Sequence, residues 1–314
     1  MRLLWQDVPT TARDQVVARL GAPVVAERSQ PGGFSPGVAS RLALADGRRV
    51  FVKAVSAGRN PVSPGMHRRE AAVLGYLPEP VPAPRLLHLL DDGDWVVLVI
   101  EDVEGTQPAL PWRTDQLRQV LTGLERLAPA LTPAPPQAPP LQETMKDDFT
   151  GWNAFAADPS RLDRFGPWPV TELDRLTALE ARWPEAARGD TLLHADLRAD
   201  NLLLTPAGEV VLVDWPHAAV GAAWCDVLFM MPSVLAAARP AGGLDPETLW
   251  AEFGPARSAA RDDVDAVLAA LTGYFLFHST LPAPKNLTGL REFQAEQGVA
   301  ALAWLRQRLE RAGA

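Results

Sequence analysis

The sequence predicts an α+β fold in which a small β-rich lobe, residues 1–101, precedes a larger helical lobe, residues 102–314. Two observations support this division. Segments with strand-like alternation or continuous apolar character are concentrated before residue 101, whereas later apolar residues recur mainly with the three- and four-residue spacing of helices. The polar stretch 101–105 separates the two patterns and is expected to be a connector. A chain of 314 residues can bury a sizeable core in one or two domains.

The N-terminal lobe is expected to contain a short helix, three strands and a second helix. Val38–Leu44 alternates as strands do, and Asp46-Gly47 is a common hairpin turn ahead of a second strand. The continuous apolar character of residues 95–100 predicts a strand buried on both faces. The predicted elements are a helix over 9–20, strands over 38–44, 50–55 and 95–100, a polar loop over 58–65 and a helix over 66–77.

The C-terminal lobe is expected to be helical apart from one hairpin. Residues 133–140 hold five prolines, which predicts a stiff linker or the edge of a lid. Strands over Leu202–Leu204 and 210–213, joined by a tight turn, form the hairpin. The predicted helices cover residues 112–131, 171–188, 227–238, 262–280 and 287–311.

Composition and charge exclude several classes of protein. The net charge of −8 is uneven: residues 1–102 carry 12 basic and 11 acidic side chains, and residues 103–314 carry 18 and 27. Nucleic-acid binding is disfavoured, because phosphate backbones need basic surfaces. The acidic second half favours a cationic small molecule, and the alternative is an acidic surface that only keeps the protein soluble. No signal peptide or membrane-spanning segment is expected, and the single cysteine, Cys225, is expected to be a packed thiol in a reducing cytoplasm.

The hairpin predicts a metal site at its open end. Asn201 stands just before the first strand and Asp214 just after the second, so the turn brings both side chains to one end. Two oxygen ligands suit magnesium, which otherwise keeps water and substrate phosphates. The alternative is that both residues only form turns at strand ends.

Two further polar residues, His194 and Asp196, lie shortly before the hairpin. Asp196, five residues before Asn201, is expected to orient a substrate hydroxyl and accept its proton. His194 is expected to support the loop through hydrogen bonds rather than to move protons. The run H-A-D-L-R-A-D-N, followed by V-D-W, has the layout of the protein-kinase catalytic signature, H-R-D-L-x-x-x-N with a later Asp.

A lysine inside an apolar strand points to phosphate binding. Lys53 is costly to bury without an anionic partner, and Glu70 on the next predicted helix supplies one. Kinases position a phosphate-binding lysine by such a pair, and the alternative is a lysine exposed on an edge strand. Backbone amides near Ser35, in the loop 31–37, are expected to cover the phosphates, although the loop lacks G-x-G-x-x-G and also suits an ordinary hairpin.

Several other polar and aromatic residues are expected to be structural. Asp226 is expected to cap a helix or to brace the loop around Asp196. The tryptophans near residue 168 are expected to pack in the core, with a substrate-pocket wall as the alternative. Three aspartates of the helix 262–280 are expected to lie on a solvated face, with contacts to a substrate amine as the alternative. These residues are Trp152, Trp168, Trp183, Asp262, Asp263 and Asp265.

The motifs together resemble the aminoglycoside phosphotransferase family, the small-molecule branch of the protein-kinase-like fold. The resemblance covers about residues 20–235 and is carried by HADLRADNLLL at 194–204, VVLVDWPHAAVGAAWCDV at 210–227, VPAPR at 81–85 and REAAVL at 69–74. It implies a bilobal kinase-like fold with Asp196 as catalytic base. It also implies that magnesium binds Asn201 and Asp214, and that Lys53 contacts nucleotide phosphate and pairs with Glu70. The adenine would bind backbone groups of the connector, at Ile100, Glu101 and Val103.

The expected function is therefore ATP- and magnesium-dependent phosphorylation of a hydroxyl on a small polar molecule, such as an aminoglycoside or an amino sugar. GTP remains open as the donor, as do the acceptor and the oligomeric state. A protein acceptor is disfavoured, because residues 221–226 follow Asp214 almost at once and leave no room for an activation segment. The main alternative is a catalytically silent binding protein that keeps the kinase fold.

Overall fold

The computed structural model describes residues 3–30, 36–238 and 244–312. The chain divides into two units, which we call the β-rich unit and the helical unit. The β-rich unit consists of Met1–Gln107, Asp200–His217 and Pro284–Thr288, and the helical unit of Pro108–Ala199, Ala218–Ala283 and Gly289–Ala314. The predicted α+β class is confirmed, with the large sheet in the first unit and most helices in the second.

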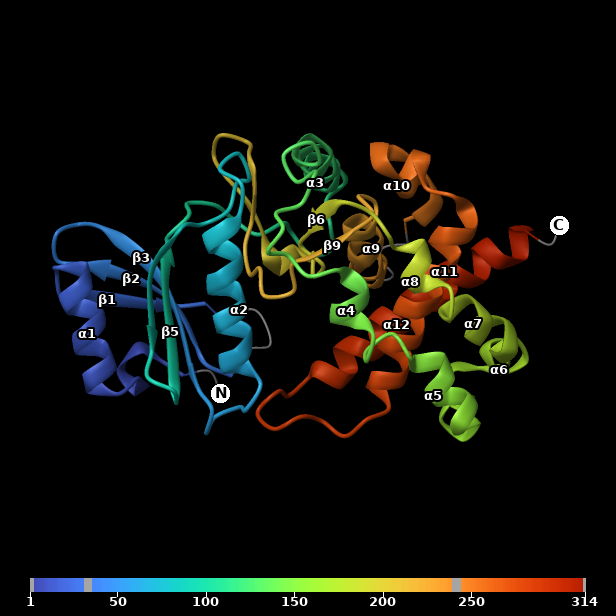
Figure 1. Ribbon diagram of the computed structural model, residues 1–314, viewed down its shortest axis with the longest axis horizontal. Coiled ribbons are helices and arrows are strands. Elements are labelled where there is room, and N and C mark those ends of the chain that lie inside the picture. Colours follow the sequence, from blue (N-terminus) through green and yellow to red (C-terminus); the bar gives the residue numbers. More distant parts are fainter. Residues whose placement is uncertain (1–2, 31–35, 239–243, 313–314) are drawn as a thin grey trace. The chain divides into compact units, whose positions relative to one another are not determined.

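An antiparallel five-stranded sheet organises the β-rich unit (Figure 1). Its strands lie in the order β1-β2-β3-β5-β4. The three inner strands match the predicted ones, whereas neither edge strand was predicted. Most residues of β1 are exposed, and β4 carries leucines at exposed and covered positions alike, so neither strand shows a clear apolar alternation. The bounds are β1 Val24–Ser29, β2 Val38–Leu44, β3 Arg49–Ser56, β4 Leu86–Asp91 and β5 Trp95–Glu101.

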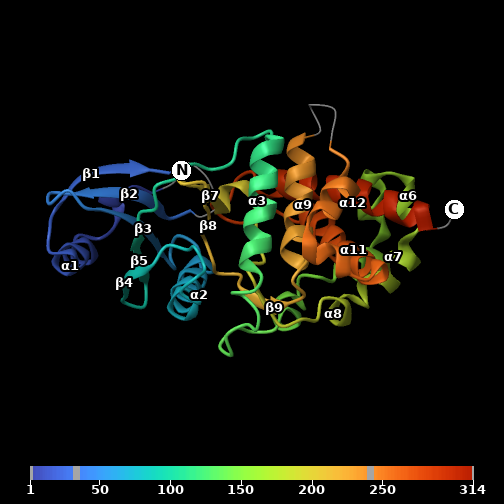
Figure 2. The ribbon, with the colours of Figure 1, turned by 90° about the horizontal axis from the view of Figure 1, so that it is seen from above.

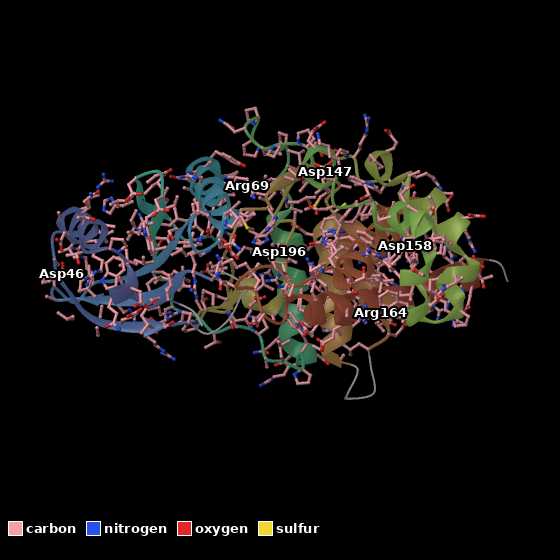
Figure 3. The ribbon with its side chains drawn as sticks, turned by 90° about the horizontal axis from the view of Figure 1, so that it is seen from below. Asp46, Arg69, Asp147, Asp158, Arg164 and Asp196 are labelled. Atoms are coloured by element: carbon pink, nitrogen blue, oxygen red, sulfur yellow. The ribbon has the colours of Figure 1, made fainter. Side chains whose placement is uncertain are left out.

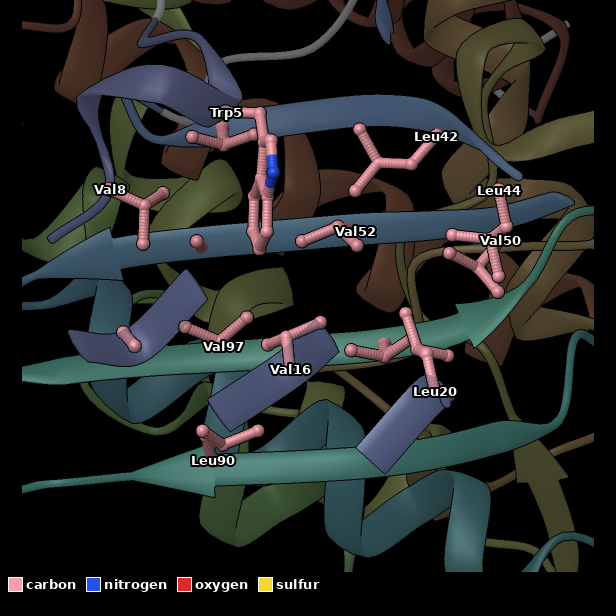
Figure 4. Close-up of a cluster of buried hydrophobic side chains, with 14 of the residues drawn as sticks. Trp5, Val8, Val16, Leu20, Leu42, Leu44, Val50, Val52, Leu90 and Val97 are labelled. Atoms are coloured by element: carbon pink, nitrogen blue, oxygen red, sulfur yellow. The ribbon is translucent and has the colours of Figure 1, made fainter. Parts of the chain in front are cut away.

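Two helices, α1 (Thr10–Leu20) and α2 (Ser63–Tyr76), cover opposite faces of this sheet. Val16 and Leu20 of α1 pack with alternate strand residues such as Val97, as Figure 4 shows. The intervening strand residues, such as Leu98, pack with α2 instead. This alternation places Val52 of β3 in the α1-side core and directs its neighbour Lys53 toward α2, where it contacts Glu70.

The second helix begins earlier than the sequence predicts. The expected polar loop 58–65 was wrong at its end, because α2 starts at Ser63. The side-chain oxygen of Asn60 accepts hydrogen bonds from the backbone amides of Val62 and Ser63, at 3.0 and 3.1 Å, and Pro64 occupies the first turn. The backbone N–H of a residue in the first turn has no partner within the helix, so a proline is tolerated there. Pro64 was interpreted as part of a loop, although it marks the start of a helix.

The predicted hairpin is present and belongs to the β-rich unit. Its strands are β7 (Leu202–Leu204) and β8 (Val210–Leu212). Leu204 bridges to Thr106, just after the connector, and the amide of Leu212 donates to the carbonyl of Pro82 at 2.9 Å. The hairpin is therefore held by backbone hydrogen bonds to segments far away in the sequence.

Helices dominate the helical unit (Figure 2). The long helix α11 packs against both α12 and α5, and α12 also packs against α9. A two-stranded sheet of β6 (Thr191–Leu193) and β9 (Ala219–Gly221) is added to them. The helices are α3 Thr114–Leu127, α4 Leu141–Met145, α5 Gly151–Ala157, α6 Pro167–Thr171, α7 Leu173–Glu180, α8 Trp183–Ala186, α9 Cys225–Ala238, α10 Pro246–Glu252, α11 Arg261–Ser279 and α12 Leu290–Ala312.

The predicted single helix over 171–188 is wrong. Three short helices, α6, α7 and α8, occupy this region, and Pro184 lies in the first turn of α8. A proline there cannot donate the hydrogen bond that would continue a preceding helix. Residues 133–140 contain no helix or strand, and α4 begins directly after them. Among the described residues, no helix is long and apolar enough to span a membrane.

Candidate active site

Lys53 lies at the centre of an ionic cluster in the β-rich unit. Its Nζ donates to both carboxylate oxygens of Glu70, at 2.7 and 2.8 Å, and to Oδ1 of Asp214 at 2.6 Å. The side chain of Glu70 is 1% exposed and that of Lys53 13%, whereas that of Asp214 is 41% exposed. Lys53 is therefore held from the buried side by Glu70 and faces the more accessible Asp214.

The cluster keeps Lys53 charged. Burial works against the charge, but the nearby Asp214 and Glu70 outweigh it and hold the pKa of Lys53 above its ordinary value. His67, one helical turn before Glu70, is also buried. Burial, together with the positive charge of Lys53, lowers the pKa of His67 to about 4, so this ring adds no charge at neutral pH.

The chain around Asp214 has an unusual and well-anchored backbone. Asp214 has a φ of 68°, a left-handed conformation that non-glycine residues adopt rarely and mostly where surrounding contacts enforce it. Trp215 is fully buried and its indole donates to the carbonyl of Leu212 at 3.0 Å. Arg69 of α2 donates to the carbonyl of Pro216 at 3.3 Å. The strained backbone at Asp214 is thus fixed by contacts to residues before it and after it in the sequence.

Asn201 lies at the same end of the hairpin as Asp214. The carbonyl of Asn201 accepts a hydrogen bond from the amide of Val213 at 3.0 Å, which pairs it across the ribbon with the residue just before Asp214. Among the described residues, no group of three or more histidines, cysteines or carboxylates could hold a metal by itself. An amide and a carboxylate oxygen at one ribbon end nevertheless fit magnesium when a bound substrate supplies further oxygens.

The loop that carries His194 and Asp196 belongs to the helical unit and is braced by Asp226. The buried carboxylate of Asp226, in the first turn of α9, accepts the amides of His194 and Ala195 at 2.8 and 2.7 Å. Ala195 has a φ of 62°, so this turn is also left-handed. Nδ1 of His194 accepts the amide of Asp196 at 3.3 Å. Burial raises the pKa of Asp226 to about 6 despite the two amide donors.

The sequence did not single out Arg198, yet Arg198 contacts Asp196 directly. Its Nη1 donates to Oδ1 of Asp196 at 2.8 Å, and its guanidinium carbon lies 5.3 Å from the ring centre of Phe293 in α12. Asp196 is labelled in Figure 3. A basic residue two positions after Asp196 was visible in the sequence, but only the fold shows that it pairs with Asp196 and meets α12.

Tyr274 and His278 of α11 form a second group that the sequence did not indicate. Burial, followed by the charges of Asp148 and Asp196, raises the pKa of Tyr274 to about 12. The rings of Tyr274 and His278 are 4.4 Å apart, and Nε2 of His278 lies 4.0 Å from Oδ1 of Asp148. Asp148 and Asp196 therefore both act on Tyr274, and Asp148 also lies beside His278.

The connector residues named from the sequence are already partly engaged. Ile100 is buried in β5, and the amide of Glu101 donates to the carbonyl of Arg85 at 2.9 Å. The carbonyl of Val103 accepts from Arg41 at 3.2 Å. Asp102, which the sequence did not indicate, has a side chain only 1% exposed and lies 3.3 Å from Arg41. Ser35 lies outside the described residues.

The remaining structural expectations have mixed outcomes. Trp152 and Trp183 are buried in the helical unit, and Trp168 is half-buried with the guanidinium of Arg306 5.9 Å from its ring centre. Asp262 is exposed as expected. The expectation for Asp265 was wrong: it is buried and binds Arg308, because it faces α12 rather than solvent. Cys225 is a buried free thiol.

Comparison with protein families gives a match over most of the chain. The family described as the phosphotransferase enzyme family matches residues 37–262 of this chain. This range includes the Lys53 cluster, the loop of Asp196 and Asp226. This match agrees with the resemblance found in the motifs.

Solved structures of aminoglycoside phosphotransferases share the fold. A thermostable mutant of APH(4)-Ia, in ternary complex with ADP and hygromycin B, aligns with a TM-score of 0.59 at 15% identity over 95% of this chain and 98% of its own. APH(3'')-Id from Streptomyces rimosus, with ADP and streptomycin, gives 0.53 at 20% identity, covering 84% and 98%. An aminoglycoside phosphotransferase from Alicyclobacillus acidocaldarius gives 0.51 at 19% identity, covering 92% and 93%. The predicted protein-kinase-like fold is thereby confirmed.

Proposed function

Since the chain belongs to the phosphotransferase enzyme family, we propose that it transfers the γ-phosphoryl group of ATP to a hydroxyl of a small polar molecule in the presence of magnesium. The observation that carries this proposal is the ionic cluster in which Glu70 and Asp214 hold Lys53 at 2.6–2.8 Å. A charged lysine fixed in this way is suited to bind the phosphates of a nucleotide.

In the proposed reaction Lys53 binds the α- and β-phosphates, while Glu70 fixes its position. Glu70 is buried and both of its oxygens accept from Nζ, so the ammonium group cannot move away without leaving a buried carboxylate without its counter-ion. Asp214 is more exposed and shares the same ammonium group, so incoming phosphate oxygens would compete with it for Lys53. Related structures with ADP support a nucleotide as the donor. Adenine would bind backbone groups at Ile100, Glu101 and Val103.

Asn201 and Asp214 would hold magnesium, which when bound neutralises part of the charge on the phosphates. Both residues lie at one end of the hairpin, and their oxygens have the hardness that magnesium prefers. The backbone strain at Asp214 is consistent with a carboxylate that must point in one direction.

Asp196 would act as the catalytic base. The acceptor oxygen forms a bond to the γ-phosphorus while the bond from that phosphorus to the β–γ bridging oxygen breaks, so ADP leaves and the hydroxyl proton passes to Asp196. Asp226 supports this role, because its bonds to the amides of His194 and Ala195 fix the turn before Asp196. His194 would support the same turn through the Asp196 amide.

The acceptor is proposed to carry an amine near its reacting hydroxyl. Asp196 is itself paired with Arg198, but Asp148 is a second carboxylate in this group: it lies beside His278, is 47% exposed and acts with Asp196 on Tyr274. A partly exposed carboxylate favours a cation. The related structures with hygromycin B and streptomycin support an aminoglycoside or another amine-bearing polyol as the acceptor class.

Two measurements test the proposal. Calorimetry with ATP or GTP, each with magnesium, measures nucleotide binding, and a nucleotide-consumption screen over aminoglycosides, macrolides, sugars and amino alcohols identifies the acceptor. We expect binding of at least one nucleotide and acceptor-dependent turnover. Absence of any nucleotide binding would contradict the proposal. Tight nucleotide binding with neither phosphorylation of an acceptor nor slow hydrolysis of the nucleotide by water would instead favour a catalytically silent binding protein.

A further inference from the structure

Arg198 connects the loop of Asp196 to helix α12. One end of its guanidinium donates to Oδ1 of Asp196 at 2.8 Å, and its carbon lies 5.3 Å from the centre of the Phe293 ring. The side chain of Arg198 is 18% exposed and that of Asp196 29%, so the pair is largely shielded from solvent. An ion pair with so little exposure is screened less than a surface pair.

The two contacts of Arg198 have different physical effects. The positive charge beside Asp196 favours the ionised form of its carboxylate. The planar guanidinium against the face of Phe293 is held by a cation–π contact, and a planar fork directs its donors better than a flexible ammonium does. Phe293 therefore orients Arg198, and Arg198 orients the carboxylate.

We propose that Arg198 is a positioning residue for Asp196, whose carboxylate it holds by an ion pair and turns toward the acceptor hydroxyl, and that Phe293 of α12 holds Arg198 in place. This inference rests on the proposed role of Asp196 as catalytic base. It makes the orientation of Asp196 depend on helix α12, which lies outside the sequence motif around Asp196. Changes in α12 near Phe293 should therefore alter turnover through Arg198.

The other groups near Asp196 act on it less directly. Asp226 is close enough for the two carboxylates to repel each other, and Tyr274 is influenced by the charge of Asp196. His194 accepts the amide of Asp196 rather than contacting its carboxylate. Arg291 acts on the same tyrosine. Among these described contacts, Arg198 supplies the positive charge at hydrogen-bond distance.

The chain offers a matched control pair in the same unit. Arg161 donates to Asp158 at 2.8 Å and its guanidinium carbon lies 6.0 Å from the centre of the Phe277 ring. Figure 3 shows Asp158 well apart from Asp196. Arg161→Met therefore removes an arginine with the same two kinds of contact, but without a proposed role in the reaction. The test variants are Arg198→Met, which removes the charge and keeps the volume, Arg198→Lys, which keeps the charge and loses the planar fork, and Phe293→Leu.

The first measurement needs no acceptor. Carbon-13 NMR of labelled aspartate follows the titration of the Asp196 carboxyl, assigned by its loss in Asp196→Asn. We expect Arg198→Met to move the titration midpoint to higher pH, Arg198→Lys to leave it near that of the wild-type protein, and Arg161→Met to leave it unchanged. An unchanged midpoint in Arg198→Met would overturn the inference.

The second measurement is the pH profile of nucleotide turnover. Arg198→Met should shift the acidic limb of kcat to higher pH and lower the plateau about tenfold or more, because small misplacements of a catalytic group are costly. Arg198→Lys and Phe293→Leu should lower kcat without moving the limb. A wild-type protein without turnover would refute the proposed function, whereas normal turnover and an unshifted limb in Arg198→Met would refute only the role of Arg198.

Discussion

Both carboxylate oxygens of Glu70 bind the Nζ of Lys53, at 2.7 and 2.8 Å. Glu70 comes from helix α2 and Lys53 from strand β3, so the bond fixes the helix to one face of the sheet at the point where the lysine projects. Burial of Glu70 to 1% exposure makes the pair sensitive to the loss of either member.

Glu70→Gln is expected to weaken nucleotide binding. The variant keeps the shape of the side chain but loses the charge opposite Lys53, and charge-assisted hydrogen bonds contribute about 1.5–3 kcal/mol, or about 10–100-fold in affinity. Calorimetry with ATP and magnesium measures the change. The control is Asp91→Asn, which removes the exposed partner of Arg68 on the same helix and should leave affinity unaltered. Equal affinities for Glu70→Gln and the wild-type protein would count against the role of Lys53.

Asp226 is expected to make stability depend on pH between about 4 and 6. Burial raises its pKa in the folded protein to about 6, above the ordinary value of 3.8 for an aspartate, so the folded state holds the proton more tightly than the unfolded state. Its contribution to the free energy of unfolding is therefore complete below about pH 4 and falls by up to about 3 kcal/mol as the pH rises through 6.

Denaturant unfolding of the wild-type protein and of Asp226→Asn across this range isolates that contribution. The difference between the two free energies of unfolding should change with pH as Asp226 titrates. The variant should also lose about 1–3 kcal/mol through its poorer bonds to the amides of His194 and Ala195. A pH-independent difference would show that Asp226 ionises as an ordinary carboxyl.

Asp265→Ala is expected to destabilise the helical unit by about 3–5 kcal/mol, because it leaves the buried Arg308 without its partner on α11. Glu247 retains bonds to Arg308 at 2.9 and 3.1 Å and limits the loss. Glu310→Ala removes an exposed ion pair with Arg306 on the same helix and should cost less than about 1 kcal/mol. Thermal unfolding of both variants distinguishes them, and similar losses would mean that the buried pair contributes no more than the exposed one.

The sequence predicted the parts of the fold whose patterns are local. The inner strands β2, β3 and β5 carry clear alternation or continuous apolar residues, and each was found within a residue or so of its predicted ends. The edge strands β1 and β4 were missed, because β1 is exposed at most of its positions and β4 carries leucines on both its exposed and its covered face, so neither shows an apolar alternation. The prediction of one helix over 171–188 was wrong, because the helical spacing of apolar residues continues across Pro184. In the structure Pro184 lies in the first turn of a separate helix, α8.

The candidate site likewise contains residues that local sequence patterns predict and residues that they do not. Local patterns selected these residues: Lys53 stands in an apolar strand, Glu70 lies on the next helix and Asp214 follows the hairpin, and the three meet in the structure. Arg198 was not predicted, because its nearness to Asp196 in the sequence does not show that the two side chains pair or that Phe293 packs on the guanidinium. Tyr274 was not predicted because α11 brings it under the charge of Asp196 only through long-range packing, and His278 lies beside it on the same helix. Asp265 illustrates the reverse error, where an acidic residue on a polar-looking helix is buried against a long-range partner.

The most direct test of the proposed phosphoryl transfer is the kcat of Asp196→Asn with the acceptor that the screen identifies, measured beside its affinity for ATP and magnesium. Asparagine keeps the size of the side chain but cannot accept the proton. We expect kcat to fall by about 10²–10⁴-fold while the nucleotide Kd stays within about twofold of the wild-type value. Turnover equal to that of the wild-type protein would contradict the assignment of Asp196 as the catalytic base.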